Sequence, residues 1–302
     1  MLETSLVDLH MHSSVSDGTD SPAELLDRVR EAGIGLFALT DHDAVRGCQE
    51  IRALLRPDDP MFLTGVEFSC RDDLGKYHIL GYGCDMNSPA IRDVVDLGHS
   101  YRLKKLRIRL DYLKREFGFA FPPEAEKSLF AQSNPGKPHI GNLMVRFGFA
   151  KSKDQAIREY LNRLHIREDY VRPEEAIRGI LGAGGIPVLA HPSYGDGDQL
   201  ILGQELEDRV LRLMGFGLLG LEAYYSGFTG KMRAEVLEQA ERHGLYVTAG
   251  SDYHGANKLV RLGDTGFPSE PPYPAGWERF LHDILDASAK HNTICIGGEE
   301  NQ

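Results

Sequence analysis

Histidines and acidic residues of this chain stand in short motifs whose spacing suits metal binding. His10 and His12 lie two positions apart, and so do Asp252 and His254. Because residues i and i+2 of a strand point to the same face, each pair can converge on one ion or on neighbouring ions. Imidazole and carboxylate groups are suitable ligands for Zn²⁺, Fe²⁺ and Mn²⁺. Similar side chains stand in or directly after other apolar runs, namely His42, Glu67, His78 and His191.

Each of these residues also has an ordinary explanation. A histidine in an apolar run, such as His78, is more often a packed core residue than a ligand. Asp17 lies in a Ser-Asp-Gly sequence that is typical of a turn, and Glu67 could cap a helix or pair with an arginine. An HxH pair alone is a weak signal as well. The same residue types recur, however, at the ends of five predicted strands, and this joint pattern favours a metal cluster.

The elements that must position these side chains are seven predicted strands with helices between them. The first helix is well marked, because Ser21 is a suitable N-cap, Glu24 completes a capping box and Gly33 follows the helix. Later helix patterns end in glycine just before a strand, which favours a parallel barrel or sheet with its active site at the C-terminal mouth. The predicted strands are Leu6–Met11, Leu36–Thr40, Phe62–Phe68, Tyr77–Tyr82, Ile186–Ala190, Leu218–Tyr224 and Leu245–Gly250.

The rhythm of strands and helices changes between residues 88 and 173. Tyr101–Glu116 has the pattern of a basic amphipathic helix, and Ser152–Leu161 that of a second helix capped by Ser152. No strand is predicted there. We therefore expect residues 1–87 and 174–302 to form the barrel domain, and residues 88–173 to form an inserted helical subdomain that covers the active site.

Composition narrows the class of protein. The chain has 302 residues, 41% of them hydrophobic, and a formal net charge of −11. This balance argues against a surface that coats duplex DNA. The absence of a long apolar run and of a signal-peptide pattern predicts a cytoplasmic protein with no membrane partner. We expect a monomer or small homo-oligomer. The four cysteines are scattered, which predicts reduced thiols.

Taken together, these motifs resemble those of the PHP (polymerase and histidinol phosphatase) superfamily. The resemblance runs from Asp8 to about Gly266 and includes DLHMHS, TDHD, GVEFS, HILGY, AHPS and GSDYHG. Within the superfamily the chain is most similar to stand-alone phosphoesterases that act on nucleoside bisphosphates and short RNA ends. The resemblance implies an α/β fold, a distorted (β/α)7 barrel with an inserted helical subdomain.

The resemblance also implies two to three divalent ions, Mn, Fe or Zn, held by nine side chains. Glu67, His191 and Asp252 would be the catalytic residues among them. Asp8 and Asp41 would orient imidazole rings through their second nitrogen. The three ligand sets would be His10, His12, Glu67 and Asp252 for one ion, Glu67, His78 and His191 for the second, and Asp17, His42 and His254 for the third.

Charge supports phosphate as the substrate of such a site. Three divalent ions bring about +6 and three carboxylates offset about half of it, so a phosphate dianion would neutralise most of the remainder. A hydroxide shared by two ions would attack phosphorus, and the third ion would help the alkoxide to leave. No serine or cysteine nucleophile is needed.

Substrate contacts are expected in the insertion. Lys137 and His139 lie in a segment that resembles a family Arg-Pro-His motif, here with lysine in place of arginine. Arg102 and Lys105 would point inward from the basic helix. Tyr82 and Tyr225 could stack on a base or simply pack in the core. We expect hydrolysis of a nucleoside 3′,5′-bisphosphate to the 5′-monophosphate. The alternatives are a 5′-to-3′ exonuclease on short 5′-phosphorylated RNA, a histidinol-phosphate-type phosphatase, an amidohydrolase and a silent metal-binding module.

Overall fold

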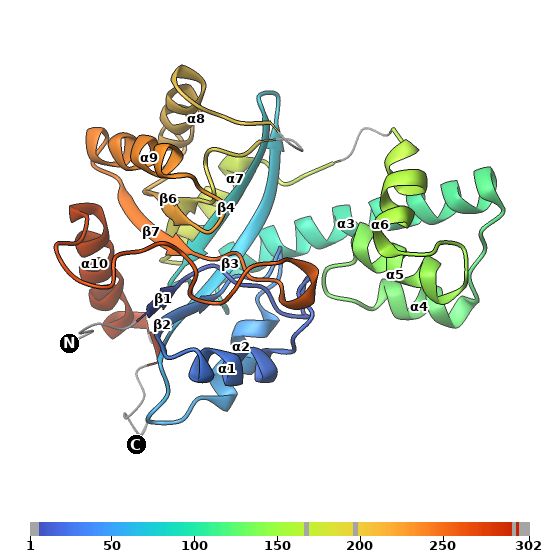
Figure 1. The fold of residues 1–302 in the computed structure, drawn as a ribbon, viewed down its shortest axis with the longest axis horizontal. Helices are drawn as coiled ribbons and strands as arrows, with labels where there is room; N and C mark the ends of the chain where they lie inside the picture. The colour runs from blue at the N-terminus through green and yellow to red at the C-terminus, as the bar shows by residue number, and fades with distance from the viewer. Residues whose placement is uncertain (1–5, 166–168, 196–198, 292–293, 296–302) are drawn as a thin grey trace.

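The computed structural model describes residues 6–165, 169–195, 199–291 and 294–295, and shows a sheet flanked by helices with a helical arm beside it (Figure 1). Seven strands follow one another across the sheet in chain order, and a short eighth strand pairs with the third. The strands are β1 Leu6–Asp8, β2 Ile34–Leu39, β3 Met61–Asp72, β4 Gly75–Tyr82, β5 Ile186–Leu189, β6 Gly220–Tyr225, β7 Tyr246–Gly250 and β8 Ile294–Cys295.

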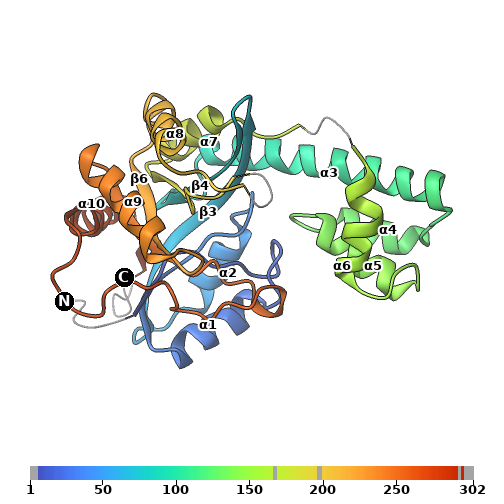
Figure 2. The same ribbon diagram turned by 45° about the horizontal axis from the view of Figure 1, so that its top comes forward.

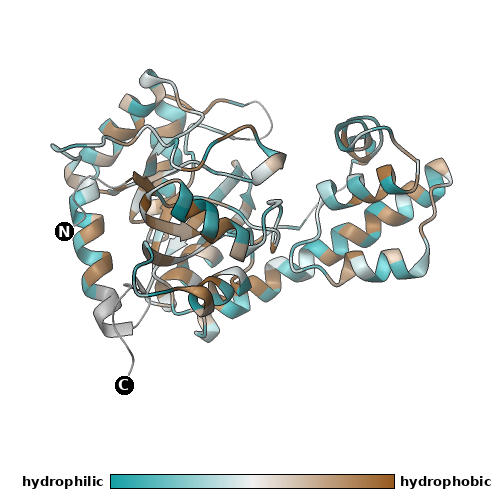
Figure 3. Ribbon diagram, turned by 60° about the horizontal axis from the view of Figure 1, so that its bottom comes forward, coloured by the Kyte–Doolittle hydropathy of each residue, from teal (hydrophilic) through white to brown (hydrophobic). Residues whose placement is uncertain are grey.

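The helices around the sheet form where the sequence carries caps and an apolar stripe. In the first helix, Ser21 Oγ accepts the Glu24 amide at 3.3 Å, and Glu24 Oε2 accepts the Ser21 amide at 2.8 Å, so the predicted capping box is confirmed. Figure 3 shows hydrophobic residues along one side of most helices. The helices that pack near the sheet are α1 Pro22–Glu31, α2 Arg46–Leu54, α7 Pro173–Gly182, α8 Gln204–Met214, α9 Gly230–Arg242 and α10 Ala275–His291.

Strand direction differs from the prediction at one strand. β4 runs antiparallel to both β3 and β5, whereas the other neighbouring pairs of the seven-strand series are parallel. The reason is the connection after β3, where only Asp73 and Leu74 separate the two strands, too few residues for a crossover helix. The expectation of a wholly parallel series is therefore wrong at this hairpin.

The two ends of the sheet approach each other without forming a ladder among the described residues. Leu9 N donates to Ala249 O at 2.9 Å, and a single bridge joins Met11 to Tyr253. All seven predicted strands are present, but closure into a barrel is not confirmed. The described architecture is an α/β fold with a mostly parallel sheet.

The segment between β4 and α7 is helical, as predicted, and contains more helices than expected. The predicted helix 101–116 is part of a 29-residue helix, α3 Pro89–Phe117. Ser152 caps the predicted second helix by accepting the Gln155 amide at 3.1 Å. Two further helices lie between them. The remaining helical pieces are α4 Pro123–Phe130, α5 Lys137–Arg146, α6 Lys153–Gln155, the π-helical turn η1 Ala156–Tyr160 and the 3-10 turn η2 Leu161–Arg163.

Helix α3 links two apolar cores. Ile91 and Val94 near its start belong to the main core under the sheet, whereas Leu106, Leu110 and Leu113 belong to a second cluster with α4 to η2. Figure 2 shows α4 to α6 beside the far end of α3, away from the strands. The exact division at residues 88 and 173 stays a prediction. No helix among the described residues has the length and hydropathy to cross a membrane.

The cysteine side chains that the structure describes are reduced. Cys48, Cys70 and Cys84 are buried free thiols, and the side chain of Cys295 lies outside the described part.

Candidate metal centre

All nine predicted ligands gather on one side of the sheet. His10, His12 and Asp17 follow β1, His42 follows β2, and the other ligands come from or follow later strands. Glu67 is not at a strand end, since β3 continues for five residues beyond it into the hairpin with β4. Seven of the nine form three groups whose ligand atoms lie within 4.8 Å of one another, namely His12, Asp17, His42 and His254; His10, His12 and Glu67; and His42, Glu67 and His78. His191 and Asp252 border these groups through contacts to Glu67 and His12.

Glu67 is the centre of the deeper part of this cluster. Its Oε2 lies 3.3 Å from His10 Nε2 and 3.1 Å from His12 Nε2. Its Oε1 lies 2.8 Å from His78 Nδ1 and 3.4 Å from His191 Nε2. His42 Nδ1 lies 3.1 Å from Oε2 as well. Each carboxylate oxygen therefore faces a different set of histidines, which is the arrangement that a bridging ligand needs.

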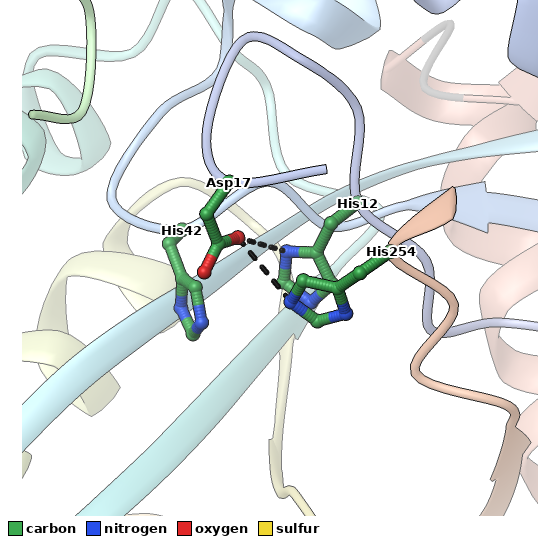
Figure 4. Close-up of side chains that lie close together, drawn as sticks. All are labelled: His12, Asp17, His42 and His254. Atoms are coloured by element: carbon green, nitrogen blue, oxygen red, sulfur yellow. Dashed lines mark ion pairs between the residues drawn. The ribbon is translucent and has the colours of Figure 1, made fainter. Parts of the chain in front are cut away.

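Asp17 is the centre of the outer part (Figure 4). Its Oδ1 lies 3.3 Å from His254 Nε2 and 3.8 Å from His12 Nδ1, and His42 lies within the same group. Exposure varies across the cluster, since the side chains of Asp17 and His78 are 28% and 29% exposed, whereas those of His10 and His12 are fully buried. Asp252 connects the two parts, because its Oδ1 is 3.4 Å from His12 Nε2 and 3.3 Å from His254 Nδ1.

The unsatisfied atoms of the cluster fit divalent cations. His10 Nε2, His12 Nε2 and Glu67 Oε2 are buried, face one another and have no hydrogen-bond partner among the described residues. Buried polar atoms without partners are costly, and a cation ligated by all three removes that cost. The donor set of imidazole nitrogens and carboxylate oxygens suits Zn, Fe or Mn.

The charges of the cluster shift the pKa values of its members strongly. Burial alone would raise the pKa of Glu67, but the imidazoles of His42 and His10 hold it well below its usual range. Burial alone would lower the pKa of His12, but the carboxylates of Asp252 and Glu67 raise it to about 10. Burial lowers the pKa of His42 to about 3 in spite of Glu67. Carboxylates here stay ionised, ready to ligate a cation.

Glu222 is a functional candidate that the sequence analysis missed. It is fully buried in β6, where its Oε1 lies 2.9 Å from His10 Nδ1 and its Oε2 accepts the His191 amide at 2.8 Å. The first contact turns His10 Nε2 towards Glu67, and the second fixes the backbone of another ligand. The only available signal was an acidic residue inside an apolar run, in Gly-Leu-Glu-Ala-Tyr.

Asp8 and Asp41 accept backbone amides and serine hydroxyls rather than imidazole N–H groups. Asp8 accepts the amides of Ser251 and Gly263, both at 2.9 Å, and so ties the segment after β7 to β1. Asp41 accepts the Ser13 amide at 2.8 Å and the Ser16 hydroxyl at 2.6 Å. Their described hydrogen bonds shape the ligand-bearing loops, which differs from the predicted contact with ring nitrogens.

Lys258 and Tyr225 hold the free oxygen of Asp252. The Tyr225 hydroxyl donates to Asp252 Oδ2 at 3.0 Å, and the Lys258 ammonium donates to the same oxygen and to Tyr225 Oη. Tyr225 therefore has a polar role as well as packing. Tyr82 is fully buried, and its hydroxyl donates to Leu9 O at 3.0 Å, so stacking of Tyr82 on a base is excluded.

A cationic cavity of about 260 Å³, here called the phosphate cavity, adjoins the cluster. Arg102, Lys105, Lys137 and His139 line it, together with the ligands Asp17, His42 and His78. All four predicted substrate contacts thus lie around one cavity. Lys76 and Arg109 line it too and were not predicted.

The cations of the phosphate cavity are held in place by neighbours. Arg102 Nε donates to Asp43 Oδ2 at 2.7 Å, and its Nη2 donates to Ser69 Oγ at 2.9 Å. Lys105 Nζ lies 3.7 Å from the centre of the Tyr170 ring, a cation–π contact. Asp43 adopts φ +46°, a conformation that is unusual for a residue other than glycine and that needs support from its surroundings.

One hydrogen bond joins the helical segment to a predicted ligand, and two further bonds orient cavity residues within that segment. Asn134 Nδ2 donates to the carbonyl of His42 at 2.7 Å. His139 Nδ1 accepts the Gly136 amide at 3.2 Å, so its proton is on Nε2, which can donate to an anion. Burial lowers the pKa of His139, which favours this neutral form. Lys137 Nζ donates to Asn162 Oδ1 at 2.8 Å.

Comparisons with known proteins agree with this geometry. The PHP domain model matches residues 8–290. The 3′,5′-nucleoside bisphosphate phosphatase of Chromobacterium violaceum is 30% identical over 278 residues, 88% of this chain and 92% of the relative. The 5′-3′ exoribonuclease of Haemophilus influenzae is 27% identical over 280 residues, 92% of this chain and all of the relative.

A solved structure has the same fold. An amidohydrolase from Chromobacterium violaceum, with bound sulfate and no metal, is 29% identical, with a TM-score of 0.77. The match covers 94% of this chain and 97% of that chain. The motifs, the cluster and the relatives lead to one conclusion: the chain belongs to the PHP family, and it is a metal-dependent phosphoesterase.

Proposed function

We propose that the enzyme hydrolyses the 3′-phosphate of a nucleoside 3′,5′-bisphosphate and releases the nucleoside 5′-monophosphate. The observation that carries the proposal is the pairing of two anion sites. The metal cluster suits the reacting phosphate, and the phosphate cavity beside it suits a second phosphate of the same molecule. Asp17, His42 and His78 border both sites, so the two phosphates would be held close together.

Different residues of this chain would act at the 3′-phosphate and at the 5′-phosphate. Glu67, His191 and Asp252 would hold the ions at the 3′-phosphate, with Glu222 and Lys258 fixing their orientation. Divalent ions, when bound, supply a water of lowered pKa and positive charge for the phosphoryl oxygens. Lys137, Arg102 and Lys105 would neutralise the 5′-phosphate, and His139 would donate from Nε2. Binding of the remote phosphate would thereby orient the reacting one.

A nuclease reaction is the second candidate, because the exoribonuclease relative aligns with this chain over the relative's entire length. Both reactions break the bond between phosphorus and O3′, and they differ in whether the phosphate carries a further nucleotide. The sulfate in the Chromobacterium violaceum structure supports an anionic substrate over an amide, since sulfate has the shape and charge of a phosphate.

The experiment compares two substrates in two lysine variants. Lys137→Ala removes a charged group of the phosphate cavity, whereas Lys127→Ala removes an exposed lysine of α4 in the same segment. A charge-assisted contact contributes about 1.5–3 kcal/mol. We therefore expect Lys137→Ala to lower kcat/KM for the bisphosphate about ten- to a hundredfold more than for p-nitrophenyl phosphate. Lys127→Ala should lower neither.

Equal losses of Lys137→Ala on both substrates would assign the lysine to the chemistry or the fold and remove the support for a second-phosphate site. Faster hydrolysis of a 5′-phosphorylated dinucleotide than of the bisphosphate would favour the exonuclease.

A further inference from the structure

The phosphate cavity carries more positive charge than a single phosphate needs. Among its described lining residues, five lysines and arginines stand against two carboxylates, a surplus of three positive charges. A phosphate monoester brings about −1.5 to −2 at pH 7, and a second phosphate linked to it adds about one more charge, which brings the total close to the surplus. The five cations are Lys76, Arg102, Lys105, Arg109 and Lys137, and the two carboxylates are Asp17 and Asp43.

Three of these cations follow one face of α3. Arg102, Lys105 and Arg109 are separated by three and four residues, the spacing that aligns side chains along a helix. At a rise of about 1.5 Å per residue, the row is about 10 Å long. Lys105 is 8% exposed and Arg109 is 7% exposed, so both belong to the cavity wall rather than to the outer surface. The row is longer than one phosphate group.

The hairpin of β3 and β4 carries a fourth cation in the same direction. Lys76 lies two positions before His78 in β4, so the two side chains point to the same face, about 6.5 Å apart along the strand. Strand pairing sets Ser69 opposite His78, and Arg102 Nη2 donates to Ser69 Oγ at 2.9 Å. Arg102 therefore lies at the level of the predicted metal ligand, and Lys76 lies one step further out.

The ring of Tyr170 shows which cation of α3 lies at that outer level. Arg71 is opposite Lys76 in the hairpin. The Tyr170 ring centre is 6.0 Å from the Arg71 guanidinium carbon and 3.7 Å from Lys105 Nζ. Lys76 and Lys105 are thus joined through neighbours, and Arg109 follows one turn later in α3. The phosphate cavity therefore has an inner part near the metal cluster and an outer part further along α3.

We propose that the outer part, formed by Lys76 and Arg109 with Lys105 between the two parts, binds the terminal phosphate of a 5′-diphosphate. The substrate class is then a nucleoside 5′-diphosphate that carries a 3′-phosphate. The proposal rests on the proposed function, because it keeps the 3′-phosphate at the metal cluster and the first 5′-phosphate beside Arg102 and Lys137. The cavity of about 260 Å³ has room for both 5′-phosphates, since one water needs only about 10–15 Å³.

The reaction remains hydrolysis of the 3′-ester. Water adds to the 3′-phosphorus, the bond from phosphorus to O3′ breaks, and O3′ takes up a proton. The products are inorganic phosphate and the nucleoside 5′-diphosphate. The anhydride bond of the diphosphate stays intact, because the cavity holds it among lysines and arginines and away from the metal cluster.

Binding of two nucleotides without a 3′-phosphate tests the outer part separately from the reaction. Isothermal titration calorimetry compares adenosine 5′-diphosphate with adenosine 5′-monophosphate on the chelator-treated protein, so that neither ligand can bind through metal ions. One additional charge-assisted contact should make the diphosphate bind about tenfold more tightly. Adenosine 5′-phosphosulfate has the same length and about one charge less, and it should bind more weakly than the diphosphate.

The variants remove one cation at a time. Lys76→Gln should lower affinity for the diphosphate about tenfold more than affinity for the monophosphate. Arg109→Gln should have the same selective effect, and Arg109→Lys, which keeps the charge, should retain most of the affinity if Arg109→Gln fails to fold. Lys114→Gln is the matched control, because Lys114 is an exposed lysine of α3 that does not line the phosphate cavity, and it should match the wild type.

Three results would overturn the outer phosphate site. They are equal affinity of the wild type for the diphosphate and the monophosphate, no greater selective loss in Lys76→Gln than in Lys114→Gln, and binding of the phosphosulfate as tight as that of the diphosphate. With metal-loaded enzyme, KM should be about tenfold lower for adenosine 3′-phosphate 5′-diphosphate than for the bisphosphate. Release of phosphate from neither substrate would overturn the proposed function, and the calorimetry would still decide the outer site.

Discussion

Glu67 and Glu222 are both buried glutamates, yet they act at different distances from the ions. Glu67 directs its two oxygens to two different sets of histidines. Glu222 contacts a histidine nitrogen that faces away from the cluster. Loss of the Glu67 carboxylate should remove a metal ligand. Loss of the Glu222 carboxylate should only disturb the orientation of the ligand His10.

This difference predicts separate metal-binding behaviour for two conservative variants. Glu67→Gln should lower the number of ions that the protein retains, because one carboxylate serves two ion positions. Glu222→Gln should keep that number but weaken affinity about ten- to a hundredfold, because a group that orients a ligand has an effect of that size. Elemental analysis gives the number, and competition with a fluorescent chelator gives the affinity.

His282→Ala supplies the control for both variants, because the His282 side chain is 72% exposed on α10 and belongs to no described ligand group. It should match the wild type in number and affinity. A Glu67→Gln protein with the full number of ions would contradict the bridging role.

At the scale of residues, the sequence indicated the side chains that cluster better than the side chains that support them. His10 with His12, and Asp252 with His254, have a spacing that a strand converts into convergence. Glu222 has no such partner in the sequence, since its contacts are 212 and 31 positions away. The pairing of β6 with β7, and the approach of β7 to the residues after β1, bring it to His10. Side chains that act across strands cannot be recognised from local spacing.

At the scale of elements, the hairpin of β3 and β4 is the main departure from the prediction. The sequence indicated strands at both places, but a two-residue turn and a long ladder were not expected. The ladder sets Ser69 opposite His78 and Glu67 opposite Leu80, so Glu67 and His78 are fixed by strand pairing rather than by loops. Helices α4 and α5 were missed because each is short and rich in charged or turn-forming residues.

Helix α3 couples the helical segment to the site, and this coupling can be tested in the second apolar cluster. Leu113 is fully buried there, so Leu113→Ala should destabilise the segment by about 2–5 kcal/mol. Hydrogen exchange should increase in residues 104–163, while strands β1 to β7 keep their protection. Hydrolysis of the bisphosphate should fall more than that of p-nitrophenyl phosphate.

Val145→Ala is the matched change at a surface position of α5, where the side chain is 37% exposed. It should leave exchange close to that of the wild type. Increased exchange across the sheet in Leu113→Ala would mean that the two cores unfold as one unit.

At the scale of the whole molecule, the seven predicted strands are present and the segment between β4 and α7 is helical, whereas the short strand β8 was not predicted and closure of the sheet was not confirmed. Closure depends on how the residues after β1 meet those after β7, and here one bridge and a few hydrogen bonds make the link. Asp8 adds two bonds across the same gap. Contacts between residues so far apart in the sequence cannot be predicted from the periodicity of apolar residues.

The stability of the whole protein should depend on metal and pH together. His12 has a raised pKa of about 10, so it holds a proton at neutral pH that a metal ion must displace. Each displaced proton makes metal affinity rise about tenfold per pH unit. Between pH 6.5 and pH 8 the binding free energy of Mn²⁺ should become more favourable by about 2 kcal/mol for each displaced proton. The increase in melting temperature on adding Mn²⁺ should therefore be larger at pH 8 than at pH 6.5.

The metal-free protein should show the opposite trend. A raised folded-state pKa contributes stability that is complete below the usual value of 6.5 and declines as the pH rises towards 10. Thermal unfolding with a chelator and with Mn²⁺, at both pH values, measures both effects. A larger metal-induced increase at pH 6.5 would contradict the proton assigned to His12.

The gradient of exposure across the centre has a consequence for how the enzyme is handled. His10 and Glu67 are almost inaccessible to water, whereas Asp17 and His254 border it. Ions at the inner position should therefore have long residence times, and an ion at the outer position should exchange with buffer. Affinity resins that leach or strip metals would then yield a mixture of fully and partly loaded molecules, all folded. Specific activity would follow the occupancy of the outer position, and batches would differ until they were equilibrated with the same free metal concentration.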